Sequence, residues 1–279
     1  MRGKTRRARK MRKACLGFLG AGQMAEAIAR GVIGAGILKP DGILASDVAE
    51  DRREVFRSLG ASVTADNAEV VRGCRDVIVA VKPQNLPTLL PEIGPALSAK
   101  HLLMTICAGC PTAQFEAASA APVRVVRAMP NLPMRVGKGV TAICRGRHAS
   151  DADLARAERL FGAAGAVVRV EERLMDAVTA LSGSGPAYVY FLAEAMIEAG
   201  IMEGLPPETA RALAVETIRG AGEMMSAEPV PPEELRRRVT SKGGTTEAAF
   251  RSLEESGARA AFVRAIRAAA ARARELGRK

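Results

Sequence analysis

The segment that decides the fold is CLGFLGAGQMA, residues 15–25. It predicts a short apolar strand, a glycine turn and the start of a helix. Its small residues follow the pattern Gly20-x-Gly22-x-x-Ala25, the dinucleotide fingerprint with Ala at the third small position. Gly20 permits the tight turn, Gly22 lets the backbone approach a pyrophosphate, and Ala25 lets the helix pack against the strand. The helix N-terminus then offers free N–H groups to the phosphates. Small residues at such a turn can also serve packing alone, so the choice between a cofactor site and a structural turn depends on the rest of the chain.

The positive charge of the chain is concentrated at its N-terminus. Of the 41 Lys and Arg that give the formal net charge of +11, eight lie in residues 1–13, which hold no acid; the other 33 face 30 acidic residues. We interpret this segment as a disordered basic tail. A nucleic-acid-binding arm is the alternative, but no aromatic residues interleave with the charges for base stacking.

Composition predicts a cytoplasmic protein with no membrane segment. No apolar run reaches the length of a transmembrane helix, and no apolar core of a secretion signal follows the basic residues. The five cysteines lie in or beside apolar segments, as buried free thiols do. Cys107-x-x-Cys110 has the spacing of a redox pair, but Gly109 and Pro111 indicate a strand that ends in a loop.

Strand and helix patterns alternate up to about residue 173. Predicted strands lie at 15–19, 43–47, 62–64, 76–81, 102–107, 123–129, 139–144 and 166–170, and predicted helices at 23–38, 51–59, 67–73 and 151–162. This alternation predicts an α/β protein with a Rossmann-like, doubly wound parallel sheet over residues 14–173. From residue 174 to 279 only helical periodicity remains, which predicts an all-helical C-terminal domain.

Cofactor binding is expected at the carboxyl ends of the strands, where Lys82-Pro83-Gln84 follows a buried strand. Asp47 follows the second strand, at the position where an acid usually bonds the ribose 2′-hydroxyl of NAD. Arg52 and Arg53 come soon after and could accept the 2′-phosphate of NADP instead. The residues alone leave both cofactors open.

The second half of the chain lacks a strong base. Between Gly139 and the last two residues the only lysine is Lys242, and no histidine follows His148. Oxidation of an alcohol or reduction of a ketone needs such a group to move a proton at oxygen, whereas an imine arrives protonated or nearly so and takes hydride directly. The segment SKGGTT, residues 241–246, precedes an apolar helix, and its amides and hydroxyls suit a carboxylate. An imino acid would satisfy both features.

Five motifs resemble those of the pyrroline-5-carboxylate reductases: GFLGAGQMA (17–25), AVKPQ (80–84), RAMPNLP (127–133), DAVTALSGSGPAY (176–188) and VTSKGGTT (239–246). The resemblance covers about residues 14–277. It implies reduction of 1-pyrroline-5-carboxylate to L-proline, the last step of proline biosynthesis, by hydride transfer from NAD(P)H to the imine carbon. It favours NADP(H) over NAD(H).

The resemblance also implies roles for individual residues, none of them metal ligands. The pyrophosphate is expected on Gly20, Ala21, Gly22, Gln23, Met24 and Ala25, the adenosine ribose beside Asp47 and Asn67, and the rest of the dinucleotide along Ala80, Val81, Lys82, Pro83, Ile106, Cys107 and Ala108. The substrate carboxylate is expected on Ser241, Gly243, Gly244, Thr245 and Thr246, with Glu172 also near the substrate. Thr246 is expected to be the catalytic residue that donates to the ring nitrogen.

Two residues depart from the usual pattern of the family. Lys242 stands where proline is usual, which adds charge beside the carboxylate site and loosens the loop. Asp47 stands where many relatives carry an uncharged residue, which weakens the expectation of NADPH. The resemblance further implies a homodimer through the helical domains, larger rings up to a decamer, and an active site shared with the partner chain.

Three other functions remain open at this point. One is a related imine or β-hydroxyacid reductase, although the helix after Pro186 has no lysine, which counts against the hydroxyacid version. Another is a sensor that binds NAD(P) without catalysis. The third is a nucleic-acid-binding protein that acts through the basic tail.

Overall fold

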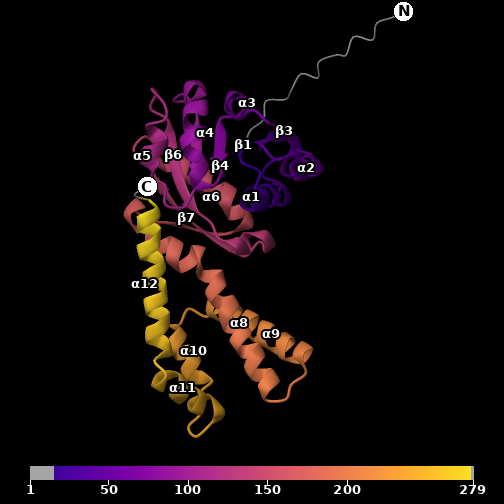
Figure 1. The fold of residues 1–279 in the computed structure, drawn as a ribbon, viewed down its shortest axis with the longest axis vertical. Helices are drawn as coiled ribbons and strands as arrows, with labels where there is room; N and C mark the ends of the chain where they lie inside the picture. Colours follow the sequence, from indigo (N-terminus) through magenta and orange to yellow (C-terminus); the bar gives the residue numbers. More distant parts are fainter. Residues whose placement is uncertain (1–15, 278–279) are drawn as a thin grey trace, which may run out of the picture. The chain divides into compact units, whose positions relative to one another are not determined.

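The computed structural model describes residues 16–277 and divides the chain into two units (Figure 1). The sheet unit contains the residues up to Gly183 together with those from Ala270 onward, and the helical unit runs Ser184–Ala269. The predicted basic tail, residues 1–13, lies outside the described residues.

The sheet unit is built on eight described strands in the order β3-β2-β1-β4-β5-β6-β7-β8. Their bounds are β1 (Leu16–Leu19), β2 (Ile43–Ser46), β3 (Ser62–Thr64), β4 (Asp76–Val79), β5 (Leu102–Thr105), β6 (Arg124–Met129), β7 (Gly139–Arg145) and β8 (Gly165–Arg169). Strand order reverses between β1 and β4, which lie side by side in register from Leu16↔Asp76 to Leu19↔Val79. Such a reversal point is where open α/β sheets bind ligands.

Helices cover both faces of this sheet. They are α1 (Gln23–Gly34), α2 (Glu50–Ser58), α3 (Asn67–Gly73), α4 (Leu86–Ile93), α5 (Thr112–Glu116), α6 (Asp151–Phe161) and α7 (Met175–Val178). Side chains alternate along each strand, so Phe18 and Ile78 pack with α1 and α6 whereas Leu19 and Val79 pack with α3 and α4. Two buried clusters, one on each face, therefore hold the doubly wound sheet together.

One strand runs against the predicted direction. The sequence predicts a parallel sheet, but β7 pairs with β6 in antiparallel register, with Arg127 opposite Cys144. The connection between them holds only a short 3-10 helix, Leu132–Val136. A parallel neighbour needs a crossover of a dozen or more residues, so this short connection folds back as a hairpin instead.

The sheet unit continues beyond the predicted boundary at residue 173. Met175 is fully buried against β7, and the Asn131 side chain donates a hydrogen bond to the Ser182 carbonyl at 3.2 Å. These contacts hold α7 and the π-helical turn Thr179–Gly183 on the sheet unit. The sequence becomes helical in its periodicity at residue 174, but the helical turns that follow still pack on the sheet. The chain leaves the sheet unit only at Gly183.

The helical unit presents most of its apolar surface to solvent. It contains α8 (Gly185–Met202), α9 (Pro207–Ala227), α10 (Pro232–Arg238), α11 (Thr245–Glu255) and the first part of α12 (Ala258–Leu276). No residue of α8 is buried, and Phe191 is 64% exposed. An apolar helix that is exposed in this way indicates an interaction surface. Within residues 16–277, no helix has the length and apolarity to cross a membrane.

Candidate active site

A cavity of about 690 Å³ lies where the carboxyl ends of β1, β2 and β4 meet. Backbone hydrogen bonds carry the sheet pairing to its rim, from Gly20 N to Ser46 O at 2.9 Å and from Ala80 N to Leu19 O at 2.8 Å. It is lined by Gly20, Gly22, Asp47, Val48, Ala49, Arg52, Asn67, Ala80, Val81, Lys82, Asn85, Thr88, Leu89 and Glu92. The two fingerprint glycines thus open onto the reversal point of the sheet.

The glycine turn has the geometry that its sequence predicts. Gly20 has φ +94°, and a Cβ there would lie 2.9 Å from the carbonyl carbon and oxygen of Ala80. A Cβ on Gly22 would meet no atom within 4 Å, because this residue faces the cavity. Ala25 is fully buried where α1 packs on the sheet. One glycine is therefore required by the fold, whereas the other leaves room for a ligand.

Asp47 supports the turn with both carboxylate oxygens. Oδ2 accepts a hydrogen bond from the backbone N–H of Ala21 at 2.8 Å, and Oδ1 accepts one from Ala49 at 2.9 Å. The carboxylate lines the cavity while it ties β2 to the fingerprint turn. Asp47 thus has a structural role beside the ribose contact that the sequence predicts for it.

Arg52 is the arginine that lines the cavity, and Arg53 is not. The guanidinium of Arg52 donates to the Ala21 carbonyl at 2.8 Å and pairs with Glu26 at 2.9 Å. Burial raises the pKa of Glu26, but hydrogen bonds from Arg52 and Arg30 outweigh it and bring that pKa below the usual value. Arg53 donates to the carbonyls of Asp47 and Val48 instead.

Asn67 joins two elements at the cavity wall. Its Oδ1 accepts from the Ser46 hydroxyl at 2.7 Å, and its Nδ2 donates to Glu92 at 2.9 Å. Glu92 belongs to α4, a helix that the sequence does not predict; Thr88 and Leu89 of this helix also line the cavity, as does Asn85, which directly precedes it. Pro87 and Pro91 obscure its periodicity, although Pro87 stands in the first turn, where proline is tolerated.

Several predicted cofactor residues lie near the cavity without lining it: Ala21, Gln23, Met24, Ala25, Pro83, Ile106, Cys107 and Ala108. Cys107 is buried, its thiol donates to the Val81 carbonyl at 3.3 Å, and burial raises its pKa to about 12. Cys110 is also a buried free thiol with a raised pKa. These properties are those of inert packing thiols and argue against a redox pair.

The predicted carboxylate loop forms a hydrogen-bonded turn in the helical unit. Gly244 N–H donates to the Ser241 carbonyl at 3.0 Å, and Gly243 has φ +71°. Gly243 N–H donates to the carboxylate of Glu247 at 2.8 Å. The backbone N–H groups of both glycines are therefore already hydrogen-bonded within the protein. The first amides of α11, those of Thr245, Thr246 and Glu247, have no partner among the described residues, as at any uncapped helix start.

Glu172 lies on the sheet unit, where its carboxylate caps α5. It accepts from the backbone N–H of Thr112 at 2.7 Å and from the Thr112 hydroxyl at 2.8 Å. The buried guanidinium of Arg127 lies 3.5 Å from Glu172 and 3.7 Å from Asp176. This network holds the segment that leads out of the sheet. The substrate contact predicted for Glu172 stays a prediction.

Comparison with known proteins finds relatives that match nearly the whole chain. Residues 172–276 match the family model described as pyrroline-5-carboxylate reductase dimerisation, and residues 15–109 match that of coenzyme F420-dependent NADP oxidoreductase. The chain is 42% identical over 265 residues to the pyrroline-5-carboxylate reductase of Methanosarcina acetivorans, which covers 95% of this chain and 98% of that protein. It is 40% identical over 264 residues to pyrroline-5-carboxylate reductase 3 of Mus musculus, covering 95% and 96%.

Solved structures agree with these relatives. The pyrroline carboxylate reductase of Plasmodium falciparum, solved with NADP bound, superposes with a TM-score of 0.86 at 31% identity, covering 96% of this chain and 99% of that one. The pyrroline-5-carboxylate reductase of Coxiella burnetii gives 0.88 at 35% identity, covering 95% and 99%. On the strength of its fingerprint cleft, its helical unit and these relatives, the chain belongs to the pyrroline-5-carboxylate reductase family.

Proposed function

We propose that this protein reduces 1-pyrroline-5-carboxylate to L-proline with NADPH. One hydride adds to the imine carbon and one proton remains on the ring nitrogen, so the C=N bond becomes CH–NH. The observation that carries the proposal is the cleft at the β1–β4 reversal point, opened by Gly22, in a chain of this family. The protein is an oxidoreductase of proline biosynthesis.

The residues of the cleft fit a nicotinamide dinucleotide, which supplies the hydride when bound. The space in front of Gly22 is the kind that a pyrophosphate fills, and the start of α1 has no side-chain cap to compete for its amides. Asp47 and Asn67 stand on the wall where the adenosine ribose is expected. Ala80, Val81 and Lys82 continue that wall and would hold the remainder of the dinucleotide.

NADPH is the proposed cofactor because a positive group stands on the wall beside Asp47. The guanidinium of Arg52 lines the cavity, and a 2′-phosphate would add a strong acceptor for it. Both oxygens of Asp47 already accept backbone N–H groups, so part of its charge is directed at the turn. The relative from Plasmodium falciparum carries NADP.

The loop at residues 241–246 is proposed to receive the substrate carboxylate. The positive end of α11 and its free amides at Thr245 and Thr246 suit an anion. The half-buried Thr246 hydroxyl is proposed to donate a hydrogen bond to the ring nitrogen and so orient the imine. Ser241, Gly243 and Gly244 shape this loop.

A homodimer through the helical unit is proposed as the working form. The match to a dimerisation domain and the exposed apolar side chains of α8 both support it. Assembly into a decamer, a shared active site and a cytoplasmic location stay predictions, as does the expectation that nucleic acid is not a partner.

The first experiment mixes purified protein with 1-pyrroline-5-carboxylate and follows the absorbance of NADPH and, separately, of NADH. Rapid oxidation with formation of proline is the expected result, faster with NADPH. Cofactor binding without any oxidation would instead indicate the sensor function or another imine as substrate.

A further inference from the structure

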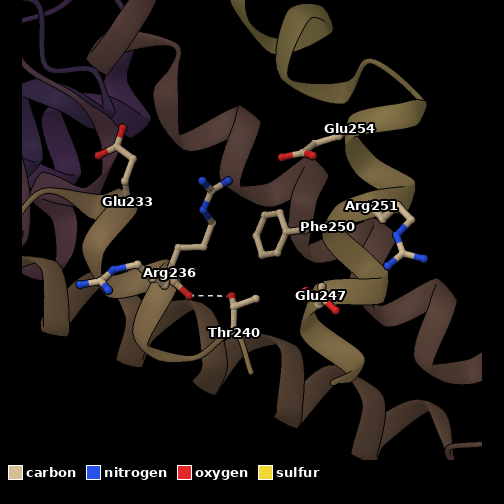
Figure 2. Close-up of a pocket in the computed structure, with 8 residues that line it drawn as sticks. Glu233, Arg236, Thr240, Glu247, Phe250, Arg251 and Glu254 are labelled. Carbon is tan, nitrogen blue, oxygen red and sulfur yellow. Dashed lines mark hydrogen bonds between the residues drawn. The ribbon is translucent and has the colours of Figure 1, made fainter. Parts of the chain in front are cut away.

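Glu247 is a carboxylate of the helical unit to which the reaction gives no role. It belongs to the first turn of α11 and lines a cavity of about 570 Å³ between α10 and α11 (Figure 2). Arg251, one helical turn further on, is the usual kind of partner for such a group. In the described part of the chain no ion pair joins them, and the carboxylate instead accepts the N–H of Gly243 at 2.8 Å.

The turn that contains Gly243 is weakly held by its own sequence. It spans Ser241 to Gly244 and closes through one backbone hydrogen bond of 3.0 Å. The third position, Gly243, has φ +71°, the sign that a type II turn requires there. Proline at the second position would fix φ in advance, but this position is Lys242, which leaves the unfolded turn more freedom. An additional contact would therefore stabilise this shape.

The hydrogen bond that Glu247 accepts from Gly243 supplies that contact and determines which backbone amides of the loop stay available. The Gly243 N–H is bound to Glu247 and the Gly244 N–H to Ser241. Among the backbone N–H groups of residues 243–247, those of Thr245, Thr246 and Glu247 itself therefore have no partner in the described residues. These three belong to consecutive residues at the positive end of a helix. A bound carboxylate would be held at these amides.

We propose that Glu247 is a positioning residue for the substrate carboxylate, acting through Gly243 to hold the Ser241–Gly244 turn. The proposal rests on the proposed function, in which this loop receives the carboxylate. In this chain Glu247 stabilises the turn through a hydrogen bond, whereas a proline at position 242 would stabilise it by fixing the backbone φ angle.

The test is a set of variants with steady-state kinetics. Glu247→Ala should raise the KM for 1-pyrroline-5-carboxylate about tenfold, as expected for loss of a charge-assisted hydrogen bond. Its kcat should stay within about threefold and its KM for NADPH should not change, because the turn orders only the carboxylate site. Glu247→Gln retains an oxygen acceptor and should stay within about threefold of the parent in KM.

Two further variants make the test specific. Lys242→Pro added to Glu247→Ala should restore most of the KM, since proline fixes the same turn. Glu254→Ala is the matched control, because Glu254 lines the same cavity without a side-chain partner among the described residues, and its KM should not move. An unchanged KM in Glu247→Ala, or a double variant no better than Glu247→Ala, would overturn the proposal.

Amide hydrogen exchange separates this proposal from the proposed function. In the protein without substrate, Glu247→Ala should speed exchange of the Gly243 and Gly244 amides, which are the hydrogen-bonded amides of the turn, and Lys242→Pro should reverse the change at Gly244. If exchange is unaffected, Glu247 does not hold the turn. If exchange responds but the parent enzyme does not reduce 1-pyrroline-5-carboxylate, the proposed reaction fails while the role of Glu247 in the turn stands.

Discussion

Substituting each fingerprint glycine by alanine should separate folding from cofactor binding. At Gly20 the φ of +94° is costly for any L-residue, by about 1–2 kcal/mol. The new Cβ would lie 2.9 Å from the Ala80 carbonyl, and moving backbone apart adds strain of about 1–3 kcal/mol. Gly20→Ala should therefore destabilise the sheet unit by about 2–5 kcal/mol and lower its Tm by about 5–15 °C.

Gly22→Ala should have the opposite profile. Its φ of −67° and ψ of 178° suit any residue, and no atom lies within 4 Å of the new Cβ. Its Tm without cofactor should match the parent or rise slightly, because alanine loses less entropy on folding. The methyl group takes the space of the pyrophosphate, so the Kd for NADPH should rise at least about tenfold as one charge-assisted hydrogen bond is lost.

The assay is a thermal melt followed by circular dichroism, with NADPH binding measured by titration calorimetry at a temperature where both variants are folded. The reasoning fails if Gly20→Ala melts with the parent, since the turn would then not need its left-handed glycine. It also fails if Gly22→Ala binds NADPH as tightly as the parent, since the cofactor would then not approach this backbone.

Three other substitutions or treatments test the remaining assignments. Thr246→Ala should lower kcat by about tenfold to a thousandfold with an unchanged melt, as for one lost transition-state hydrogen bond, and an unchanged kcat would remove Thr246 from its role. Asp47→Ser should raise the NADPH-to-NADH ratio of kcat/KM about tenfold by removing a charge beside Arg52; an unmoved ratio would leave Asp47 with only its bonds to the turn. Burial raises the pKa of Cys107 from an ordinary thiol value of 9.0 to about 12, so Cys107 should alkylate about a thousandfold more slowly at pH 8 in the folded protein than unfolded, measured by peptide mass spectrometry.

The sequence predicted most of the sheet because buried strands leave a local signature. The apolar run that contains β4 and the fingerprint that contains Gly20 and Gly22 are both legible without the fold. The direction of β7 was wrong, because direction depends on the length of a connection and on pairing partners, not on apolar periodicity. Helix α4 was missed because two prolines interrupt its pattern, and its three cavity residues, Thr88, Leu89 and Glu92, were missed with it.

What the sequence by itself determined is the chemistry that local pattern encodes: a dinucleotide turn, an alternating α/β unit, a helical unit without a strong base, and a loop of glycines and hydroxyls for which a carboxylate is predicted. Only the tertiary structure decided which hydrogen-bonding and charged groups are already paired within the protein. It directs Asp47 to Ala21, pairs Arg52 with Glu26, ties Glu172 to Thr112 and binds Glu247 to Gly243. Most of these partners are distant in sequence and meet only when packing brings their elements together, and a side chain commits its hydrogen bonds according to what lies within about 3 Å in space.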